Sequence, residues 1–196
     1  HLSDRRQRQM CIRDSPGTHD IELAVNTIKS LASGIKTKIT RFDKSIDDRI
    51  SNQVEMSEGE IGVIVIEGWC FGAEPQFENQ LITPVNELER LKDPDGTCRR
   101  YINNALATSY PKLFKMAHST IMLRAPDFDS VFEWRLEQEE KLIEKLKLTQ
   151  DGLGRMSVMS KEEIFEFIQS FQRITEACIE RMPAKVNHLL QLDPQR

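Results

Sequence analysis

The chain has 196 residues, of which 39% are hydrophobic and 30% are charged, and its formal net charge is −4 at pH 7. These values fit one soluble globular domain with a sizeable core and exclude a disordered or fibrous protein. The basic residues are scattered, which argues against a nucleic-acid partner, and no apolar run approaches the roughly 20 residues that span a membrane.

Four cysteines and four histidines lie far apart in the sequence. Their separation provides neither a local zinc-ligand spacing nor a dense disulfide framework. A reducing cytoplasm is therefore the simplest compartment for this protein.

Residues 1–14 are polar and basic and lack the periodicity of the residues that follow. We interpret them as a leader that is foreign to the protein, similar to translated adaptor sequence, with a natural disordered tail as the alternative. Residues 15–196 are expected to form a single domain.

The first regular elements are expected soon after this leader. Apolar residues at helical spacing predict a helix that Thr18 or Asp20 caps and Gly34 ends. Residues 36–42 predict a short strand that enters a polar loop. The β-branched run 61–66 then predicts a strand buried on both faces of a parallel sheet.

The second half of the chain alternates further helical and strand patterns. A capping box, Ser160 with Glu163, opens the last helix, and Pro183 ends it. Because strands separated by helices form βαβ units, we expect an α/β fold. The helices are expected at 84–91, 99–117, 127–148 and 160–181, and the strands at 121–123 and 188–192.

Glu67 directly follows the predicted strand 61–66. Open α/β sheets bind ligands beyond the carboxyl ends of their strands, and a carboxylate there suits Mg²⁺, which prefers oxygen ligands. An acidic residue at a strand end is about as often a cap or an ion-pair partner, so both roles stay open.

Two other clusters carry polar residues. Residues 16–20, PGTHD, open a helix whose N–H groups and partial positive charge suit a carboxylated substrate. Simple N-capping by Thr18 or Asp20 is the alternative. Residues 41–49 mix acids and bases in a pattern usual for a solvated loop.

In combination these motifs are far more specific than any one of them. They resemble, in the same order, those of D-glycerate 3-kinase and its bacterial and fungal kinase relatives, and the resemblance runs from about Ser15 to Arg196. The motifs are PGTHD at 16–20, RFDKS at 41–45, IEGWC at 66–70, NELE at 86–89, DPDGT at 93–97 and WRLEQ at 134–138.

The resemblance implies a P-loop kinase-like fold, with a parallel sheet flanked by helices, and phosphoryl transfer from ATP to a small hydroxy acid, foremost D-glycerate. It gives catalytic roles to Glu67, as a ligand of Mg²⁺, and to Arg135, on a lid helix near the phosphates. An ion pair with Glu139 at i+4 is the alternative for Arg135. The substrate-binding residues that it implies are His19, Asp20, Arg41 and Asp43.

The phosphate-binding motif GxxxxGK[ST] is absent, since the sequence has no Gly-Lys pair. The aspartate that the resemblance implies as catalytic base is absent too. We therefore expect that the sequence is truncated near Ser15 and that its sheet lacks the P-loop strand between 61–66 and 121–123. Such a chain is expected to be marginally stable and inactive.

Two alternatives to a glycerate kinase stay open. A sister kinase with another acceptor would share the fold and the motifs, because these do not fix the substrate. A noncatalytic nucleotide-binding or regulatory protein would lack the phosphate-binding motif altogether. The oligomeric state does not follow from the sequence.

Overall fold

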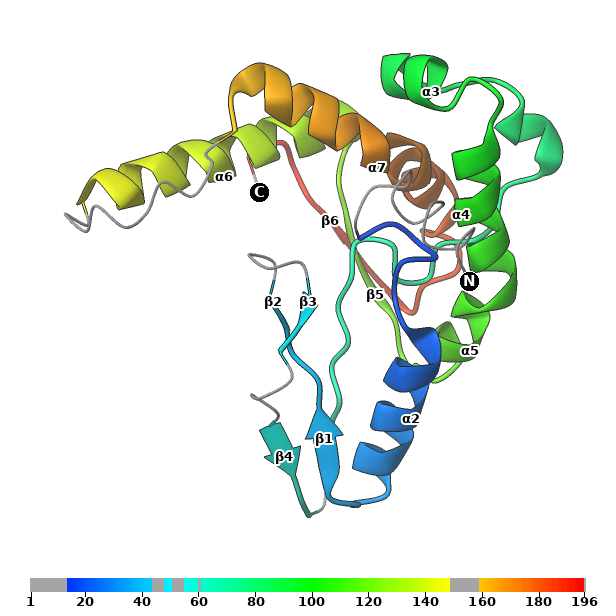
Figure 1. Cartoon of the computed structure of the whole chain (residues 1–196), viewed down its shortest axis with the longest axis vertical. Helices are drawn as coiled ribbons and strands as arrows, with labels where there is room; N and C mark the ends of the chain where they lie inside the picture. Colours follow the sequence, from blue (N-terminus) through cyan, green and yellow to red (C-terminus); the bar gives the residue numbers. More distant parts are fainter. Residues whose placement is uncertain (1–13, 44–47, 51–54, 60, 149–158, 196) are drawn as a thin grey trace.

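The computed structural model describes residues 14–43, 48–50, 55–59, 61–148 and 159–195. Residues 1–13 of the predicted leader, residues 44–47 of the polar loop and the predicted turn at 151–154 lie outside this described part. Figure 1 shows a mixed α/β arrangement in which β5 and β6 run through the centre, with helices along one side and above.

The first helix, α2 (Ile21–Ala32), begins where the sequence predicts. The Asp20 carboxylate accepts the backbone N–H of Leu23 at 3.0 Å, and Gly34 takes a positive φ of 67° after the helix ends. Both the predicted cap and the predicted stop are confirmed.

Two short antiparallel pairs follow α2, where the sequence predicts one strand and a loop. β1 (Thr37–Ile39) pairs with β4 (Glu55–Ser57), and β2 (Phe42–Asp43) pairs with β3 (Asp48–Arg49). Asp43, predicted at the start of the polar loop, is therefore a strand residue.

The prediction of a buried strand at 61–66 is wrong, because the segment forms no strand and part of it is exposed. The segment is extended but pairs with no described strand, and the side chains of Val63 and Val65 are 79% and 85% exposed. A β-branched run favours an extended backbone, but a strand also needs a neighbour that supplies ladder hydrogen bonds and covers its faces.

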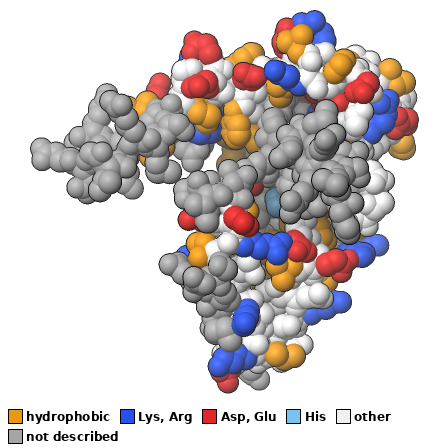
Figure 2. All heavy atoms as spheres, in the orientation of Figure 1, with side chains coloured by type: hydrophobic (Ala, Val, Ile, Leu, Met, Phe, Trp, Pro, Cys, Tyr) orange, Lys and Arg blue, Asp and Glu red, His pale blue; other side chains and the backbone are white. Residues whose placement is uncertain are grey.

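The parallel pairing that the sequence predicts occurs between β5 (Ile121–Arg124) and β6 (His188–Gln191). Burial is less than predicted, because Ile121 and Leu123 are 66% and 63% exposed while Met122 is buried. Figure 2 shows other hydrophobic side chains exposed on one face among interspersed acidic and basic ones.

The helices between the extended segment and β5 are shorter than predicted. A 3₁₀ turn, η1 (Glu78–Leu81), precedes α3 (Glu87–Lys92). The predicted helix at 99–117 is two helices, α4 (Thr97–Thr108) and α5 (Tyr110–Phe114). Pro111 has no N–H to donate, which explains the break.

The two longest helices match their predicted ranges. α6 (Phe128–Leu148) follows Asp127, whose carboxylate accepts the Ser130 N–H at 2.7 Å. α7 (Lys161–Arg181) opens with the predicted capping box of Ser160 and Glu163. The two helices pack against each other.

The main core joins α2, α4, α5 and α7 to the turn at 70–73. Apolar residues at helical spacing on these helices point inward, which is why an amphipathic pattern predicts them. The buried members are Ile21, Val25, Cys70, Ala73, Ala105, Leu106, Tyr110, Ile174 and Cys178.

Candidate functional site

The loop at 14–20 is a tight turn whose first residues are buried. The hydroxyl of Thr18 donates to the Ser15 carbonyl at 2.8 Å, and Ser15 and Pro16 are almost fully buried. Gly17 adopts φ +100°, and a Cβ there would lie 2.6 Å from Cε1 of Tyr101. Only glycine fits this position.

Two tyrosines hold this loop from the side of α4 and α5. The Tyr101 hydroxyl donates to the Gly17 carbonyl at 3.0 Å, and the Gly17 N–H donates to the Tyr110 hydroxyl at 3.1 Å. The Tyr110 hydroxyl also lies 2.6 Å from Nδ1 of His19. The His19 ring is thus held at Nδ1, while the residue as a whole is exposed.

The surroundings shift two pKa values in this cluster. Burial raises the pKa of Tyr110 to about 12, so its hydroxyl stays protonated at neutral pH. Partial burial lowers the pKa of His19 below 6.5, although the Asp14 carboxylate opposes the shift. The imidazole is therefore mostly neutral at pH 7.

Asp20 uses both of its carboxylate oxygens within the chain. One oxygen caps α2 through Leu23, and the other accepts a hydrogen bond from Arg49 of β3 at 2.8 Å. The bond from the Leu23 N–H and the contact with Arg49 lower the pKa of Asp20. The capping role is confirmed, whereas substrate contact stays a prediction. The Arg49 contact joins the hairpin at 42–49 to this loop.

Glu67 is exposed and directly precedes a turn that is attached to the same loop. The indole N–H of Trp69 donates to the Asp14 carbonyl at 3.0 Å, and the Trp69 ring packs edge-on against Phe171 of α7, with ring centroids 4.9 Å apart. Cys70 is buried in the core behind the turn. The fold thus joins two motifs about 50 residues apart, 14–20 and 67–70.

The other predicted site residues lie in the hairpin and on α6. Arg41 is exposed and precedes β2, and Asp43 pairs in register with Asp48. The Arg135 guanidinium lies 2.6 Å from the Glu139 carboxylate, the ion pair that the sequence offered as the alternative. Glu139 also accepts the Met159 N–H at 3.0 Å. Roles in the reaction for these side chains stay predictions.

Mg²⁺ in a nucleotide site takes one or two carboxylates, with phosphate oxygens and water as its other ligands. Glu67, exposed at the end of an extended segment, fits the part of a single carboxylate ligand. Within the ranges described above, no three acidic, His or Cys side chains gather to form a metal cage. The same part of the chain contains no helix long and apolar enough to cross a membrane.

The residues that would cradle the phosphates of ATP by a GxxxxGK[ST] loop do not occur in this sequence. The chain as printed therefore does not fit ATP through that motif. What it offers is a pair of joined loops, with a neutral imidazole, an exposed carboxylate and an arginine held by Asp20.

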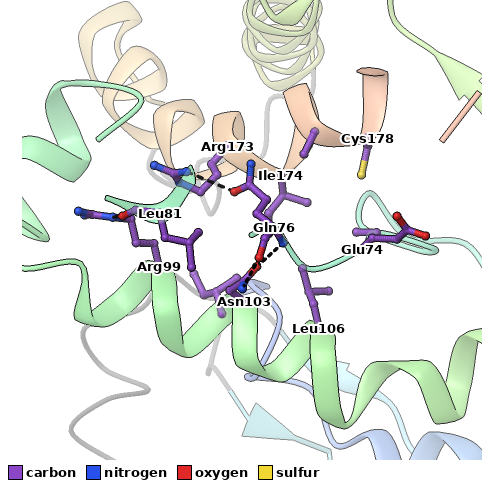
Figure 3. Close-up of a pocket in the computed structure, with 12 residues that line it drawn as sticks. Glu74, Gln76, Leu81, Arg99, Asn103, Leu106, Arg173, Ile174 and Cys178 are labelled. Carbon is purple, nitrogen blue, oxygen red and sulfur yellow. Dashed lines mark hydrogen bonds between the residues drawn. The ribbon is translucent and has the colours of Figure 1, made fainter. Parts of the chain in front are cut away.

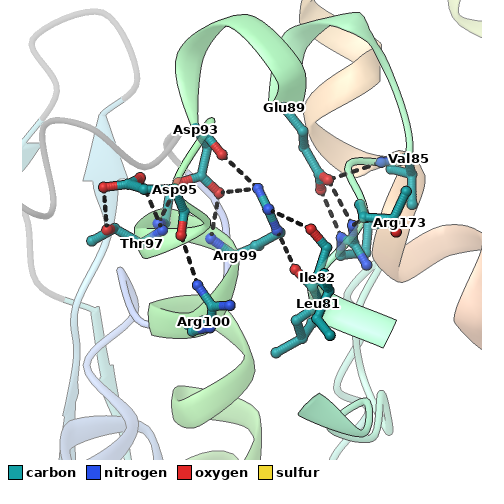
Figure 4. Close-up of polar contacts among 12 residues, drawn as sticks. Leu81, Ile82, Val85, Glu89, Asp93, Asp95, Thr97, Arg99, Arg100 and Arg173 are labelled. Atoms are coloured by element: carbon teal, nitrogen blue, oxygen red, sulfur yellow. Dashed lines mark hydrogen bonds and ion pairs between the residues drawn. The ribbon is translucent and has the colours of Figure 1, made fainter. Parts of the chain in front are cut away.

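Two buried arginines, which the sequence analysis missed, fix the segment between η1 and α4 (Figure 4). Arg99 donates to the Leu81 and Ile82 carbonyls and to Asp93, at 2.5–3.2 Å. Arg173 donates to the Gln80 and Thr83 carbonyls. Their positions on helical faces resemble those of surface arginines, so periodicity alone would not identify them.

Figure 3 shows the small cavity beside these arginines, between α4 and α7. Gln76 lines the cavity, and its side-chain oxygen accepts a hydrogen bond from Arg173 at 3.2 Å. The backbone N–H and carbonyl of Gln76 each form a hydrogen bond with the side-chain amide of Asn103. The cavity volume of about 10 Å³ is about the least that one water molecule needs. The cavity is therefore part of the scaffold and too small for a substrate.

The two curated proteins that the chain resembles are both kinases. The chain is 27% identical over 168 residues to the chloroplastic D-glycerate 3-kinase of Arabidopsis thaliana, and 25% identical over 167 residues to an uncharacterized kinase of Schizosaccharomyces pombe. The predicted resemblance to the D-glycerate 3-kinase group is confirmed. Each match covers 81% of this chain but only 32% and 56% of the respective relatives.

Solved structures agree on the fold. The D-glycerate 3-kinase of Cryptococcus neoformans matches with a TM-score of 0.73 and 21% identity, covering the whole of this chain and 73% of that one. The YGR205w protein matches with a TM-score of 0.62 and 20% identity, over 99% of this chain and 66% of that one. The predicted α/β fold class is confirmed. No family model matches the chain.

Proposed function

We propose that this chain is part of an ATP- and Mg²⁺-dependent kinase that phosphorylates a small hydroxy acid, with D-glycerate giving 3-phosphoglycerate as the first candidate. The observation that carries the proposal is the similarity to the plant D-glycerate 3-kinase, 27% over 168 residues. The ordered motifs at 16–20, 41–45 and 66–70 support the same reading.

In this proposal ATP supplies the transferred phosphoryl group and Mg²⁺ offsets its charge. The Glu67 carboxylate would hold the metal, directly or through water. His19, Asp20, Arg41 and Asp43 would orient the acceptor, and Arg135 would stabilise charge on the phosphates. Positioning and electrostatics of this kind account for most of the catalysis in phosphoryl transfer.

The printed chain spans a third to about half of its curated relatives, and it lacks the phosphate-binding motif. We therefore propose that activity belongs to a longer parent protein. The interpretation of residues 1–14 as a non-native leader stays a proposal that rests on their composition. A cytoplasmic location is part of the proposal, and its only support is the wide spacing of the cysteines in the sequence.

The test is ADP release by the full-length protein, encoded by the genomic reading frame that contains residues 15–196, with glycerate, pantothenate and uridine as separate acceptors. We expect turnover with glycerate and none by the printed chain. Turnover with another acceptor alone would favour the sister kinase. No turnover with any acceptor would refute the proposal.

A further inference from the structure

The Tyr110 hydroxyl stands between two groups of opposite hydrogen-bonding character. The Gly17 N–H, at 3.1 Å, is a donor and takes a lone pair of the hydroxyl oxygen. Nδ1 of His19, at 2.6 Å, accepts or donates according to the tautomer of the ring. The direction of this second bond decides whether Nε2 of His19 presents a donor or an acceptor to a ligand.

The number of donors around the Tyr110 hydroxyl fixes the direction of its hydrogen bond with His19. Tyr110 is 3% exposed, so water is not at hand to satisfy its proton. If Nδ1 carried a proton, the hydroxyl would receive two donors, and its own proton would have no acceptor among the contacts described, which is costly in a buried site. The hydroxyl therefore donates to Nδ1, and the proton of the neutral ring is on Nε2.

From this geometry we infer that Tyr110 is a positioning residue, which holds His19 as the neutral Nε2–H tautomer with that N–H as a donor for a ligand. Such a donor suits a carboxylate or hydroxyl oxygen of a small ligand. This last step rests on the proposed function, but the tautomer does not.

The surroundings of the ring support a neutral donor. Among the described residues, Asp14 is the charged group that raises the pKa of His19, and partial burial outweighs it and lowers the pKa. On the Tyr110 side the neighbours are Tyr101 and Cys70. Burial raises the pKa of Cys70 to about 11 and that of Tyr110 to about 12, so neither of these two groups is charged at pH 7.

The direct test is ¹⁵N NMR at pH 7.5 of the 196-residue chain with ¹⁵N-labelled histidine. The His19→Gln variant assigns the His19 signal. We expect a protonated Nε2 and a bare, hydrogen-bonded Nδ1. Tyr110→Phe should give a mixture of tautomers. The matched control is Tyr101→Phe, which removes a hydroxyl that binds the same loop through the Gly17 carbonyl and does not contact His19, so it should keep the wild-type pattern.

A protonated Nδ1 in the wild type would overturn the inference, as would an unchanged pattern in a folded Tyr110→Phe variant. If that variant does not fold, as circular dichroism would show, the wild-type spectrum still decides.

The second arm uses the full-length kinase with glycerate. Tyr110→Phe and His19→Gln should each raise KM about fivefold, and the double variant should do no more, because both remove one hydrogen bond to the ligand. Additive effects would contradict positioning through His19. If no turnover is found at all, the proposed function fails while the NMR result stands.

Discussion

Arg173 of α7 donates to both carboxylate oxygens of Glu89 on α3, at 2.7 Å each. The same guanidinium donates to the Gln80 and Thr83 carbonyls, so one side chain fixes α3 and the segment before it to the core helix. The bidentate geometry is the strongest form of an arginine–carboxylate pair.

Replacing Arg173 should therefore be severe. Arg173→Met removes the donor to the Gln80 and Thr83 carbonyls and leaves the largely buried Glu89 carboxylate without its charged partner. We expect a loss of about 3–5 kcal/mol in the free energy of unfolding, measured with urea. The control is Arg90→Met, which removes an exposed pair with Glu87 and should change stability by about 0.5 kcal/mol or less. Equal losses in the two variants would contradict this account of α3.

Gly17 provides a test of the loop at 14–20. Gly17→Ala places a Cβ against Tyr101 at φ +100°, and we expect a loss of at least about 1–2 kcal/mol in thermal or urea unfolding. Gly62→Ala is the matched control, because no atom lies within 4 Å of its Cβ and its backbone suits alanine, so stability should hold or rise by up to about 1 kcal/mol. A harmless Gly17→Ala would show that the two tyrosines do not hold the loop tightly.

The lowered pKa of His19 predicts a pH effect on stability. The unfolded chain binds a proton near pH 6.5 and the folded chain only at lower pH, so the contribution of His19 is present above 6.5 and is lost as pH falls through the folded pKa. Unfolding in urea from pH 7.5 to 5.0 should show wild type losing stability relative to His19→Gln. A constant difference between the two proteins would contradict the shift.

The unpaired segment 61–66 predicts fast hydrogen exchange. Its amides have no ladder partner within the described residues, so they should exchange at close to unfolded rates while those of α7 stay protected.

The same unpaired segment is a site for edge-to-edge association, and Val65→Lys should reduce aggregation with little change in stability. Strong protection at Val63 and Val65 would mean that another strand covers the segment.

Local signals explain what the sequence predicts correctly. Asp20, Gly34 and the Ser160 capping box act within a few residues, and each stands where the structure has a helix end. The strands β5 and β6 and the long helices also follow from apolar runs and periodicity. The order of the motifs alone indicates the resemblance to D-glycerate 3-kinase, which the comparisons with known proteins confirm.

The features that the sequence does not predict depend on contacts between residues far apart in the chain. Whether 61–66 is a strand depends on neighbours that pair with it, and its composition predicts only an extended backbone. Tyr110 contacts Gly17 across 93 positions of sequence, and Arg173 is buried because the carbonyls of another segment surround it. A tyrosine just before a proline at a helix start gives no sign of such contacts, beyond the rule that buried hydroxyls need partners.

The role of Glu67 is tested most directly by the turnover number of the full-length protein with D-glycerate, ATP and Mg²⁺. Glu67→Gln keeps the size of the side chain but removes the charge that would hold the metal, and kcat should fall about a hundredfold or more. Glu74→Gln, which loses only a surface pair with Lys185, should stay close to wild type. If kcat of Glu67→Gln matches that of Glu74→Gln, the carboxylate at this turn does not serve the metal, and the proposed site is wrong.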